Sequence, residues 1–256
     1  MQYIEVLFGF DFKEEYQRDL FVQGLADLGF ESFTDDAAYI PANLFDFDEQ
    51  ALRAYASENS QTIRSISEVP DQNWNATWEA EHPIQELPRG VHITPHCAFG
   101  AGYHETTSMM IDALLTRDLS GQTVLDMGCG TGVLGIFAKK CGAEQVVAVD
   151  IDDKSVANTL ENAQANHVSL DVRLGDTPPE GSYDLILANI HRNILLAQMP
   201  DYSRFLKKGG ELWLSGFYET DCAAIISEAS RYGLVTIDKK ERGEWRWLAM
   251  KKLMNR

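Results

Sequence analysis

The stretch Val124-Leu125-Asp126-Met127-Gly128-Cys129-Gly130-Thr131-Gly132 decides the fold of this 256-residue chain. Its first four residues read as a short buried strand, and the apolar residues between Val133 and Ala138 then have helical spacing. Glycines between a strand and a helix let a ligand lie against bare backbone amides at the start of the helix. The next predicted strand, 145–150, ends in Asp150, where a ribose diol would need a hydrogen-bond acceptor. The pattern therefore predicts a site for a nucleoside cofactor.

Two classes of nucleoside cofactor compete for this pattern. Residues 130–135 formally match the G-x-G-x-x-G string of dinucleotide-binding proteins. In that fingerprint the first glycine directly follows the strand, whereas here Gly128 does, which gives Asp-x-Gly-x-Gly-x-Gly. The carboxylate of Asp126 would lie beside the loop, where it would repel a pyrophosphate and favour a cofactor with an ammonium and a sulfonium group. The turn thus resembles motif I of the class I S-adenosylmethionine-dependent methyltransferases; a glycine-rich turn without a ligand is the other interpretation.

The composition describes a soluble globular protein with one large or two modest domains, because 45% of the residues are hydrophobic and 24% are charged. No apolar run reaches membrane-spanning length, and residues 1–5 lack the basic and apolar character of a signal peptide. The cysteines show neither metal-type spacing nor a disulfide framework; they are Cys97, Cys129, Cys141 and Cys222. We therefore predict a cytoplasmic protein with reduced thiols, no metal and no membrane association, and the sequence leaves its oligomeric state open.

The net charge of −17 argues against a surface that grips nucleic-acid backbone, because such binding needs lysine and arginine to neutralise phosphates. It permits a basic partner, attracted over a distance by the field of the protein. The acids are concentrated in residues 1–68, where fourteen acids face four bases, a net charge of −10. We expect no direct nucleic-acid binding.

Residues 1–69 are predicted to form a small ferredoxin-like α+β domain, because their elements follow a β-α-β-β-α-β order. Apolar spacing predicts these elements in turn: a strand over 4–10, a helix over 12–28, strands over 30–34 and 37–40, a helix over 47–58 and a strand over 62–69. Residues 70–90 are predicted to be a linker with a short helix, on which Trp74 and Trp78 share a face. Packing explains these two tryptophans better than substrate recognition does.

Residues 91–256 alternate strands with helices, which predicts a doubly wound α/β sheet. The predicted strands are 123–127, 145–150, 168–174, 183–189, 210–216, 233–239 and 244–251, and the predicted helices are 131–141, 153–166, 191–206 and 219–232. A short connection joins the last two strands, so they should form an antiparallel hairpin. One such hairpin on an otherwise parallel sheet matches the seven-stranded, Rossmann-like layout of methyltransferases.

Residues 98–108 contain two glycines and two threonines before a helix predicted over 109–115, which indicates a flexible flap that ends at a helix N-terminus. The hydroxyl of Thr107 can bind a cofactor carboxylate or cap the helix. His104 can be catalytic, although an ordinary loop histidine is the simpler interpretation.

Two polar residues follow predicted strands at the edge where α/β ligands bind. Asp176 can accept a hydrogen bond from an adenine amino group, or it can be a turn aspartate. Asn189 offers a carbonyl oxygen that can hold an attacking amine and aim its lone pair at a methyl carbon. The sequence after it is Ile-His-Arg rather than Pro-Pro-Tyr, so a planar base clamped against an aromatic ring is not indicated.

The flap, the Asp-x-Gly-Cys-Gly-Thr-Gly turn, Val-Asp-Ile-Asp at 149–152, Ala-Asn-Ile at 188–190 and Leu-Ser-Gly at 214–216 occur in that order. Together they resemble the bacterial methyltransferases of ribosomal large-subunit protein eleven (L11), and the small N-terminal domain and Asn73-Trp74 agree. The resemblance implies S-adenosylmethionine as cofactor, with contacts at Thr107, Gly128, Asp150 and Asn189. We add Asp126, Gly130, Gly132 and Asp176 as candidate cofactor residues and Asn189 as the candidate catalytic residue.

The flap departs from the Gly-Thr-Gly-Thr-His-Pro-Thr-Thr pattern of that family, because Ala101, Tyr103 and Glu105 replace two threonines and the proline. The departure leaves the cofactor turn intact and bears on how the flap closes and which amines it admits.

The sequence therefore predicts a protein N-methyltransferase that modifies lysine or α-amino groups of a basic ribosomal protein, recruited by the acidic N-terminal domain. Within the same class, the alternative substrates are another protein, a small molecule or an RNA. From other classes, the alternatives are a nicotinamide-dependent oxidoreductase, which Asp126 and the glycine register disfavour, and an inactive cofactor-binding module.

Overall fold

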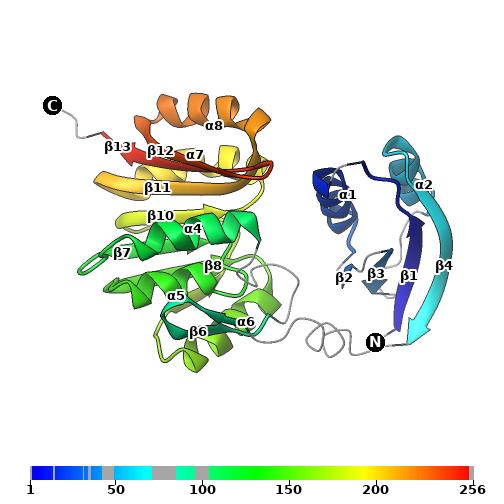
Figure 1. Cartoon of the computed structure of the whole chain (residues 1–256), viewed down its shortest axis with the longest axis horizontal. Coiled ribbons are helices and arrows are strands. Elements are labelled where there is room, and N and C mark those ends of the chain that lie inside the picture. The colour runs from blue at the N-terminus through cyan, green and yellow to red at the C-terminus, as the bar shows by residue number, and fades with distance from the viewer. Residues whose placement is uncertain are drawn as a thin grey trace. The chain divides into compact units, whose positions relative to one another are not determined.

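A computed structural model of the chain describes residues 2–13, 15–30, 32–33, 36–41, 49–70, 85–95 and 104–253. The chain divides into two compact units, Met1–Ala76 and Thr77–Arg256 (Figure 1). The predicted linker with Trp74 and Trp78 lies outside the described residues up to position 84. Residues 85–93, which the prediction divided between linker and second domain, instead form an antiparallel pair of strands.

The smaller unit pairs a four-stranded antiparallel sheet with two helices. The sheet order is β2-β3-β1-β4, and the element order is the β-α-β-β-α-β order expected from the sequence. The elements are β1 (Gln2–Gly9), α1 (Glu15–Asp27), β2 (Ser32–Phe33), β3 (Ala37–Pro41), α2 (Glu49–Glu58) and β4 (Thr62–Pro70). The helix expected from residue 12 begins at Glu15, and residues 47 and 48 lie outside the described residues.

Alternating side chains of β1 and one face of each helix build the core of the smaller unit. Ile4, Val6 and Phe8 are buried, as their spacing predicts for a half-buried strand. The rings of Phe21 on α1 and Tyr55 on α2 stack with their centroids 5.1 Å apart. A Cβ atom on Gly24 would lie 1.9 Å from the Tyr55 hydroxyl, so the two helices approach closely only because position 24 is glycine.

The larger unit contains a seven-stranded sheet with the order β12-β13-β11-β10-β7-β8-β9. Strand β13 runs opposite to the other six strands of this sheet, so the predicted doubly wound sheet with a terminal hairpin is confirmed. Its elements are β5 (Gln85–Leu87), η2 (Pro88–Gly90), β6 (Val91–Ile93), α4 (Glu105–Leu115), β7 (Thr123–Met127), α5 (Val133–Lys140), β8 (Gln145–Asp150), α6 (Asp153–Ala165), β9 (Asp171–Leu174), β10 (Tyr183–Asn189), α7 (Arg192–Phe205), β11 (Leu206–Tyr218), α8 (Glu219–Arg231), β12 (Leu234–Arg242) and β13 (Trp245–Lys252).

Helices cover both faces of this sheet, as a doubly wound fold requires (Figure 1). Buried side chains of α4, α5 and α6 form one core cluster with residues of β7, β8, β10, β11 and β13. Side chains of α7 and α8 form a second cluster on the other face. Both faces of the central strands are therefore buried, which explains why their sequences are almost continuously apolar.

In the larger unit, β11 begins at Leu206 rather than 210 and β12 ends at Arg242 rather than 239. Two further elements differ from the prediction for local reasons. Strand β9 begins at Asp171 rather than 168, because the Val168 amide bonds to the Ala163 carbonyl at 3.0 Å and His167 has a φ of 55°, so the chain is still leaving α6. Helix α4 begins at Glu105 rather than 109, because the side chain of His104 accepts the Thr106 amide and acts as an N-cap.

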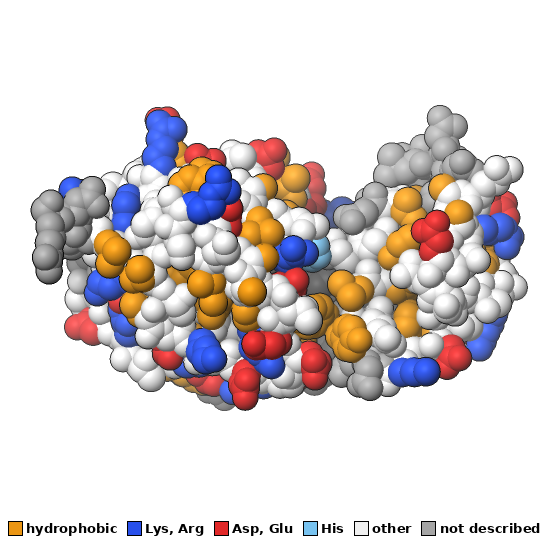
Figure 2. Space-filling view, turned by 90° about the horizontal axis from the view of Figure 1, so that it is seen from above, with side chains coloured by type: hydrophobic (Ala, Val, Ile, Leu, Met, Phe, Trp, Pro, Cys, Tyr) orange, Lys and Arg blue, Asp and Glu red, His pale blue; other side chains and the backbone are white. Residues whose placement is uncertain are grey.

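Charged and apolar side chains are interspersed over the face of the larger unit that Figure 2 shows. Among the helices that the described residues form, none is long and apolar enough to cross a membrane.

Candidate active site

The glycine loop between β7 and α5 adopts backbone angles that favour glycine. Gly128, Gly130 and Gly132 have φ values of 74°, 55° and 79°. The amides of Gly128 and Cys129 both donate to the Val149 carbonyl, at 2.8 and 3.0 Å, which ties the loop to the end of β8. A Cβ atom on Gly128 would lie 2.1 Å from Cγ2 of Ile190, so the loop also packs against the chain that leaves β10.

Asp126 comes two residues before the first glycine of this loop and is buried. Its side chain is only 1% exposed, and its Oδ2 accepts the Gly135 amide of α5 at 2.8 Å. Its Oδ1 is buried and has no hydrogen-bond partner among the described residues. Burial, with the nearby charge of Asp150, raises the pKa of Asp126 to about 7, so its ionisation is poised near neutrality.

Asp150, at the end of β8, is held by backbone amides. Its Oδ2 accepts the Gly130 amide at 2.8 Å, and its Oδ1 accepts the Asp152 amide at 3.1 Å. These bonds fix the carboxylate against the glycine loop, where the sequence predicts a ribose acceptor. Each oxygen keeps a second lone pair that a ligand hydroxyl can use.

Two apolar residues missed by the sequence reasoning lie next to Asp150 at the same edge of the sheet. Ile151 directly follows Asp150 and is 74% exposed. Leu174 pairs with Asp150 in the β8–β9 register and is 62% exposed. Large apolar side chains this exposed beside a polar site are suited to cover the flat face of a base. An apolar residue directly after the strand-ending acid was the available sequence signal.

Asp176 lies in the loop after β9, and its side chain is exposed. Its backbone carbonyl accepts a hydrogen bond from Nε2 of Gln198 on α7 at 2.6 Å, which holds this loop in place. The sequence did not predict this role for Gln198. Among the described residues no hydrogen bond joins the Asp176 carboxylate to the other candidate site residues, and its role as an adenine acceptor stays a prediction.

Thr107 and Asn189 meet although they are 82 positions apart in the sequence. Thr107 lies in the first turn of α4, is 3% exposed, and accepts a hydrogen bond from Nδ2 of Asn189 at 3.1 Å. Asn189 ends β10, whose neighbour β7 leads into the glycine loop. Strand order reverses between β10 and β7, which is where ligands of open α/β sheets bind. The structure thus brings Thr107, Asn189 and the glycine loop to one edge.

Two histidines at this edge serve as helix caps. Nδ1 of His104 accepts the Thr106 amide at 3.4 Å and lies 2.8 Å from the Thr106 hydroxyl, and Nδ1 of His191 accepts the Asn193 amide at 3.4 Å. The predicted flap is described only from His104 onwards, since residues 98–103 lie outside the described residues. Thr106 and Thr107 belong to the helix itself rather than to the segment before it.

Cys129, within the glycine loop, is a buried free thiol. Its Sγ lies 3.3 Å from the hydroxyl of Thr159 on α6, and burial raises its pKa. A thiol with a raised pKa is a poor nucleophile at neutral pH, so Cys129 acts here as a packing residue. Cys141 and Cys222 are also free, and Cys97 lies outside the described residues.

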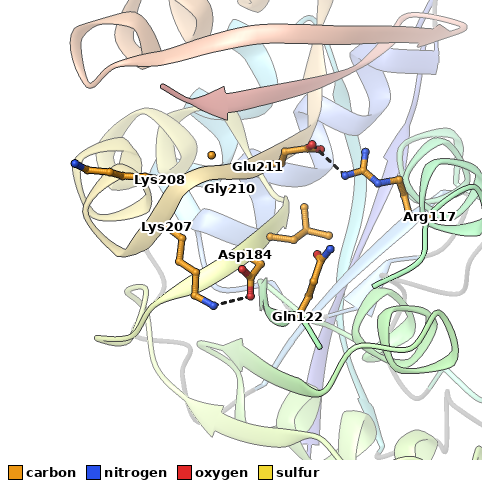
Figure 3. A pocket seen from close by; sticks show the side chains of 9 residues that line it. Arg117, Gln122, Asp184, Lys207, Lys208, Gly210 and Glu211 are labelled. Atoms are coloured by element: carbon orange, nitrogen blue, oxygen red, sulfur yellow. Dashed lines mark hydrogen bonds and ion pairs between the residues drawn. The ribbon is translucent and has the colours of Figure 1, made fainter. Parts of the chain in front are cut away.

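A pocket of about 180 Å³ lies at the opposite, amino edge of the sheet (Figure 3). Four of its five charged side chains pair with one another: Lys207 with Asp184 at 2.8 Å, and Arg117 with Glu211 at 3.0 Å. None of the candidate site residues lines it. The pocket is therefore separate from the edge that carries the glycine loop.

The arrangement at the carboxyl edge agrees with comparisons with known proteins. Residues 37–253 match the family model described as ribosomal protein L11 methyltransferase (PrmA). A ribosomal protein L11 methyltransferase of Porphyromonas gingivalis is 41% identical over 89% of this chain and 88% of its own length, and one of Phocaeicola vulgatus is 37% identical over 96% and 97%. The crystal structure of a ribosomal protein L11 methylase from Lactobacillus delbrueckii subsp. bulgaricus is 30% identical, with a TM-score of 0.57 over 60% of this chain and 81% of that one. This chain therefore belongs to the ribosomal protein L11 methyltransferase (PrmA) family, a family of S-adenosylmethionine-dependent protein methyltransferases.

Proposed function

We propose that this chain binds S-adenosylmethionine at the carboxyl edge of its large sheet and transfers methyl groups to lysine or α-amino groups of ribosomal protein L11. The observation that carries this proposal is the Asn189–Thr107 pair at the switch point beside the glycine loop. The bond from Asn189 Nδ2 to Thr107 fixes the amide plane, and it leaves Oδ1 as an acceptor for an amine N–H. The substrate is inferred from the names of the relatives.

The residues present suit the cofactor. The carboxylate of Asp150 would accept the ribose hydroxyls, and Ile151 and Leu174 would cover the adenine ring, with Asp176 as a candidate acceptor for its amino group. The glycine loop offers backbone without Cβ atoms next to α5, and Thr107 is a candidate hydroxyl donor to the cofactor carboxylate. The buried Oδ1 of Asp126 has no partner among the described residues, which fits a cationic group nearby.

The proposed chemistry depends mainly on positioning. When bound, S-adenosylmethionine supplies an electrophilic sulfonium methyl group. Asn189 would orient the amine so that its lone pair faces that carbon, because correct alignment of reacting atoms lowers the barrier substantially. The amine must arrive neutral; a free lysine has a pKa near 10.4, and transfer out of water lowers it.

We assign the released proton to water. The two histidines described at this edge, His104 and His191, use Nδ1 to cap their own helices. An imidazole engaged as a cap acceptor has one nitrogen fewer for proton transfer. Positioning by Asn189 and exclusion of water from the reacting atoms would then provide most of the rate enhancement.

The proposal is tested by mixing the enzyme with radiolabelled S-adenosylmethionine and purified L11, other basic ribosomal proteins, or ribosomal RNA. We expect label in L11 and a loss of at least 100-fold in kcat for Asn189→Ala, with a smaller change in KM for L11, because Asn189 acts in the transition state. Asn193→Ala is the matched control, since Asn193 is exposed and donates to the His191 cap through its backbone amide, which the substitution keeps. Label in RNA alone would overturn the substrate, and a loss confined to KM would overturn the role of Asn189.

We further propose that the acidic smaller unit recruits the basic substrate protein. Its first 68 residues carry a net charge of −10, and the unit has its own buried core. A variant without residues 1–76 should therefore keep its affinity for S-adenosylmethionine and lose methylation of L11. Activity of the full chain should fall as salt is raised, because screening weakens attraction between exposed charges. Equal rates for the two proteins would reject recruitment.

A further inference from the structure

Three aromatic side chains form a cluster at the carboxyl edge of the sheet, at the N-cap of α4, at the end of β11 and at the start of β13. The rings of Tyr218 and Trp245 lie with their centroids 4.3 Å apart and are tilted by 32°. The ring of His104 meets Trp245 edge-on, with centroids 4.9 Å apart. Trp245 and Tyr218 are partly buried and His104 is exposed, so the cluster is accessible at the surface.

The strand register places this cluster on the far side of Asn189 from the glycine loop. Asn189 pairs with Ser215 across β10 and β11, and Tyr218 pairs with Trp245 across β11 and β13. The glycine loop and Asp150 follow β7 and β8, on the other side of β10. His104 caps the helix whose first turn carries Thr107, the hydrogen-bond partner of Asn189. Asn189 therefore lies between the candidate cofactor residues and the aromatic cluster.

Ion pairs and hydrogen bonds hold the hairpin that carries Trp245. Arg242 on β12 donates to the Ser108 hydroxyl at 2.6 Å and to Oδ2 of Asp112 at 3.0 Å, which ties the hairpin to α4. Arg246 donates to the Trp245 carbonyl at 2.9 Å and to Oε2 of Glu219 at 2.6 Å. Trp245 is thus presented on a fixed element, as a binding wall requires.

We propose that Trp245, backed by Tyr218 and flanked by His104, forms the wall that receives the alkyl chain of the amine substrate and holds the methylated ammonium product until it loses its proton to water. This inference rests on the proposed function. An indole face attracts cations through its quadrupole, and its area packs against methylene groups. A methylated ammonium is still cationic and more apolar than the unmodified amine, so the wall holds partly methylated amines for further rounds of transfer.

The test compares Trp245→Leu and Trp245→Phe in the full-length enzyme. Leucine removes the aromatic face, and phenylalanine keeps a smaller one. We expect Trp245→Leu to raise KM for L11 by at least tenfold and to shift the products, measured by mass spectrometry, towards fewer methyl groups per amine. Trp245→Phe should stay within about threefold of the wild type, and both variants should bind S-adenosylmethionine within twofold of the wild type and melt cooperatively.

Three results would overturn the proposal: unchanged KM and products in Trp245→Leu, equal losses in both variants, or a loss of cofactor affinity that accompanies them. A second probe separates this proposal from the choice of L11. Free Nε-trimethyllysine should bind the wild type, detected by saturation-transfer NMR, and bind Trp245→Leu at least fivefold more weakly. If the wild type binds trimethyllysine but does not methylate L11, the wall stands and the proposed substrate fails; equal binding to both proteins overturns the wall.

Discussion

The amino-edge pocket and the glycine loop at the carboxyl edge hold their carboxylates in different ways. At the amino edge, charged side chains pair with each other, as in Lys207–Asp184 and Arg117–Glu211 (Figure 3). At the carboxyl edge, the carboxylates of Asp126 and Asp150 are held by backbone amides of Gly135 and Gly130 instead. A carboxylate bonded only to amides keeps its charge available, whereas one in an ion pair does not.

This difference shows that a cavity alone does not identify the functional edge. The amino-edge pocket has a volume of about 180 Å³, yet four of its five charged side chains already form ion pairs with one another. The carboxyl edge has the strand reversal, the backbone angles that favour glycine and an unpartnered buried oxygen on Asp126 among the described residues. Substitutions matched across the two edges should therefore change stability at both edges and cofactor binding at one.

The largest effect is expected for Gly128→Ala. The backbone φ of Gly128 is 74°, and a Cβ atom on this residue would lie 2.1 Å from Ile190, so the loop must move. We therefore expect the affinity for S-adenosylmethionine to fall more than 100-fold. The free energy of unfolding should fall by about 1–3 kcal/mol. Gly121 at the amino edge has the same φ, and a Cβ atom added there would meet nothing within 4 Å, so Gly121→Ala should lose stability only. Calorimetric titration measures the affinity of both variants, and thermal melting measures their stability. Similar cofactor affinities in the two variants would contradict the assignment of the site to the carboxyl edge.

Asp150→Ala should weaken S-adenosylmethionine binding by about 1–3 kcal/mol without unfolding the chain, because it removes charge-assisted hydrogen bonds. Asp184→Ala is the matched control: Asp184 also accepts a backbone amide, that of Thr123 at 2.8 Å, but at the amino edge. We expect this control to bind the cofactor as the wild type does. Unchanged affinity in Asp150→Ala would show that Asp150 is not the ribose acceptor.

The raised pKa of Asp126 predicts a pH dependence with two opposite signs. If the ionised carboxylate favours a cationic cofactor, affinity should rise by about tenfold between pH 6 and pH 8, because the ionised fraction rises through a pKa of about 7. Stability of the free enzyme should fall over about pH 4 to 7, because the folded state holds a proton that the unfolded state has released. Asp126→Asn should flatten both profiles; a wild-type affinity that is flat with pH would exclude direct electrostatic contact.

The smallest effect is expected for Lys207→Met. Its ion pair with Asp184 is partly exposed, so its loss should change stability by less than about 1 kcal/mol and leave cofactor affinity within twofold. Chemical denaturation and titration check this. A larger loss of affinity would mean that the amino-edge pocket communicates with the site.

Local pattern was sufficient for the central strands. β7, β8 and β10 begin and end at the predicted residues, because each is a short apolar run that both layers of helices bury. Local pattern failed where a side chain replaces the usual signal. His104 caps α4 although histidine is an uncommon N-cap, and the apolar residues before β9 pack against the core instead of pairing.

The parts of the site that depend on long-range contacts were harder to predict from the sequence. Asn189 and Asp150 could be predicted because each ends a recognisable strand. The contact of Ile190 with the glycine loop, and the pinning of the Asp176 loop by Gln198, join residues with no common pattern. The position of Trp245 at the carboxyl edge could have been predicted, since the predicted antiparallel hairpin already brings the start of the last strand to that edge.

The reversed direction of β13 affects the order in which the two sides of the site are synthesised. Every parallel strand presents its last residue to the carboxyl edge, whereas β13 presents its first, and it follows all the other strands in the chain. Synthesis from the N-terminus therefore produces the glycine loop, Asp150 and Asn189 before Trp245. A growing chain acquires the residues assigned to the cofactor before the wall assigned to the amine, so an enzyme that modifies a ribosomal protein would complete its substrate side last.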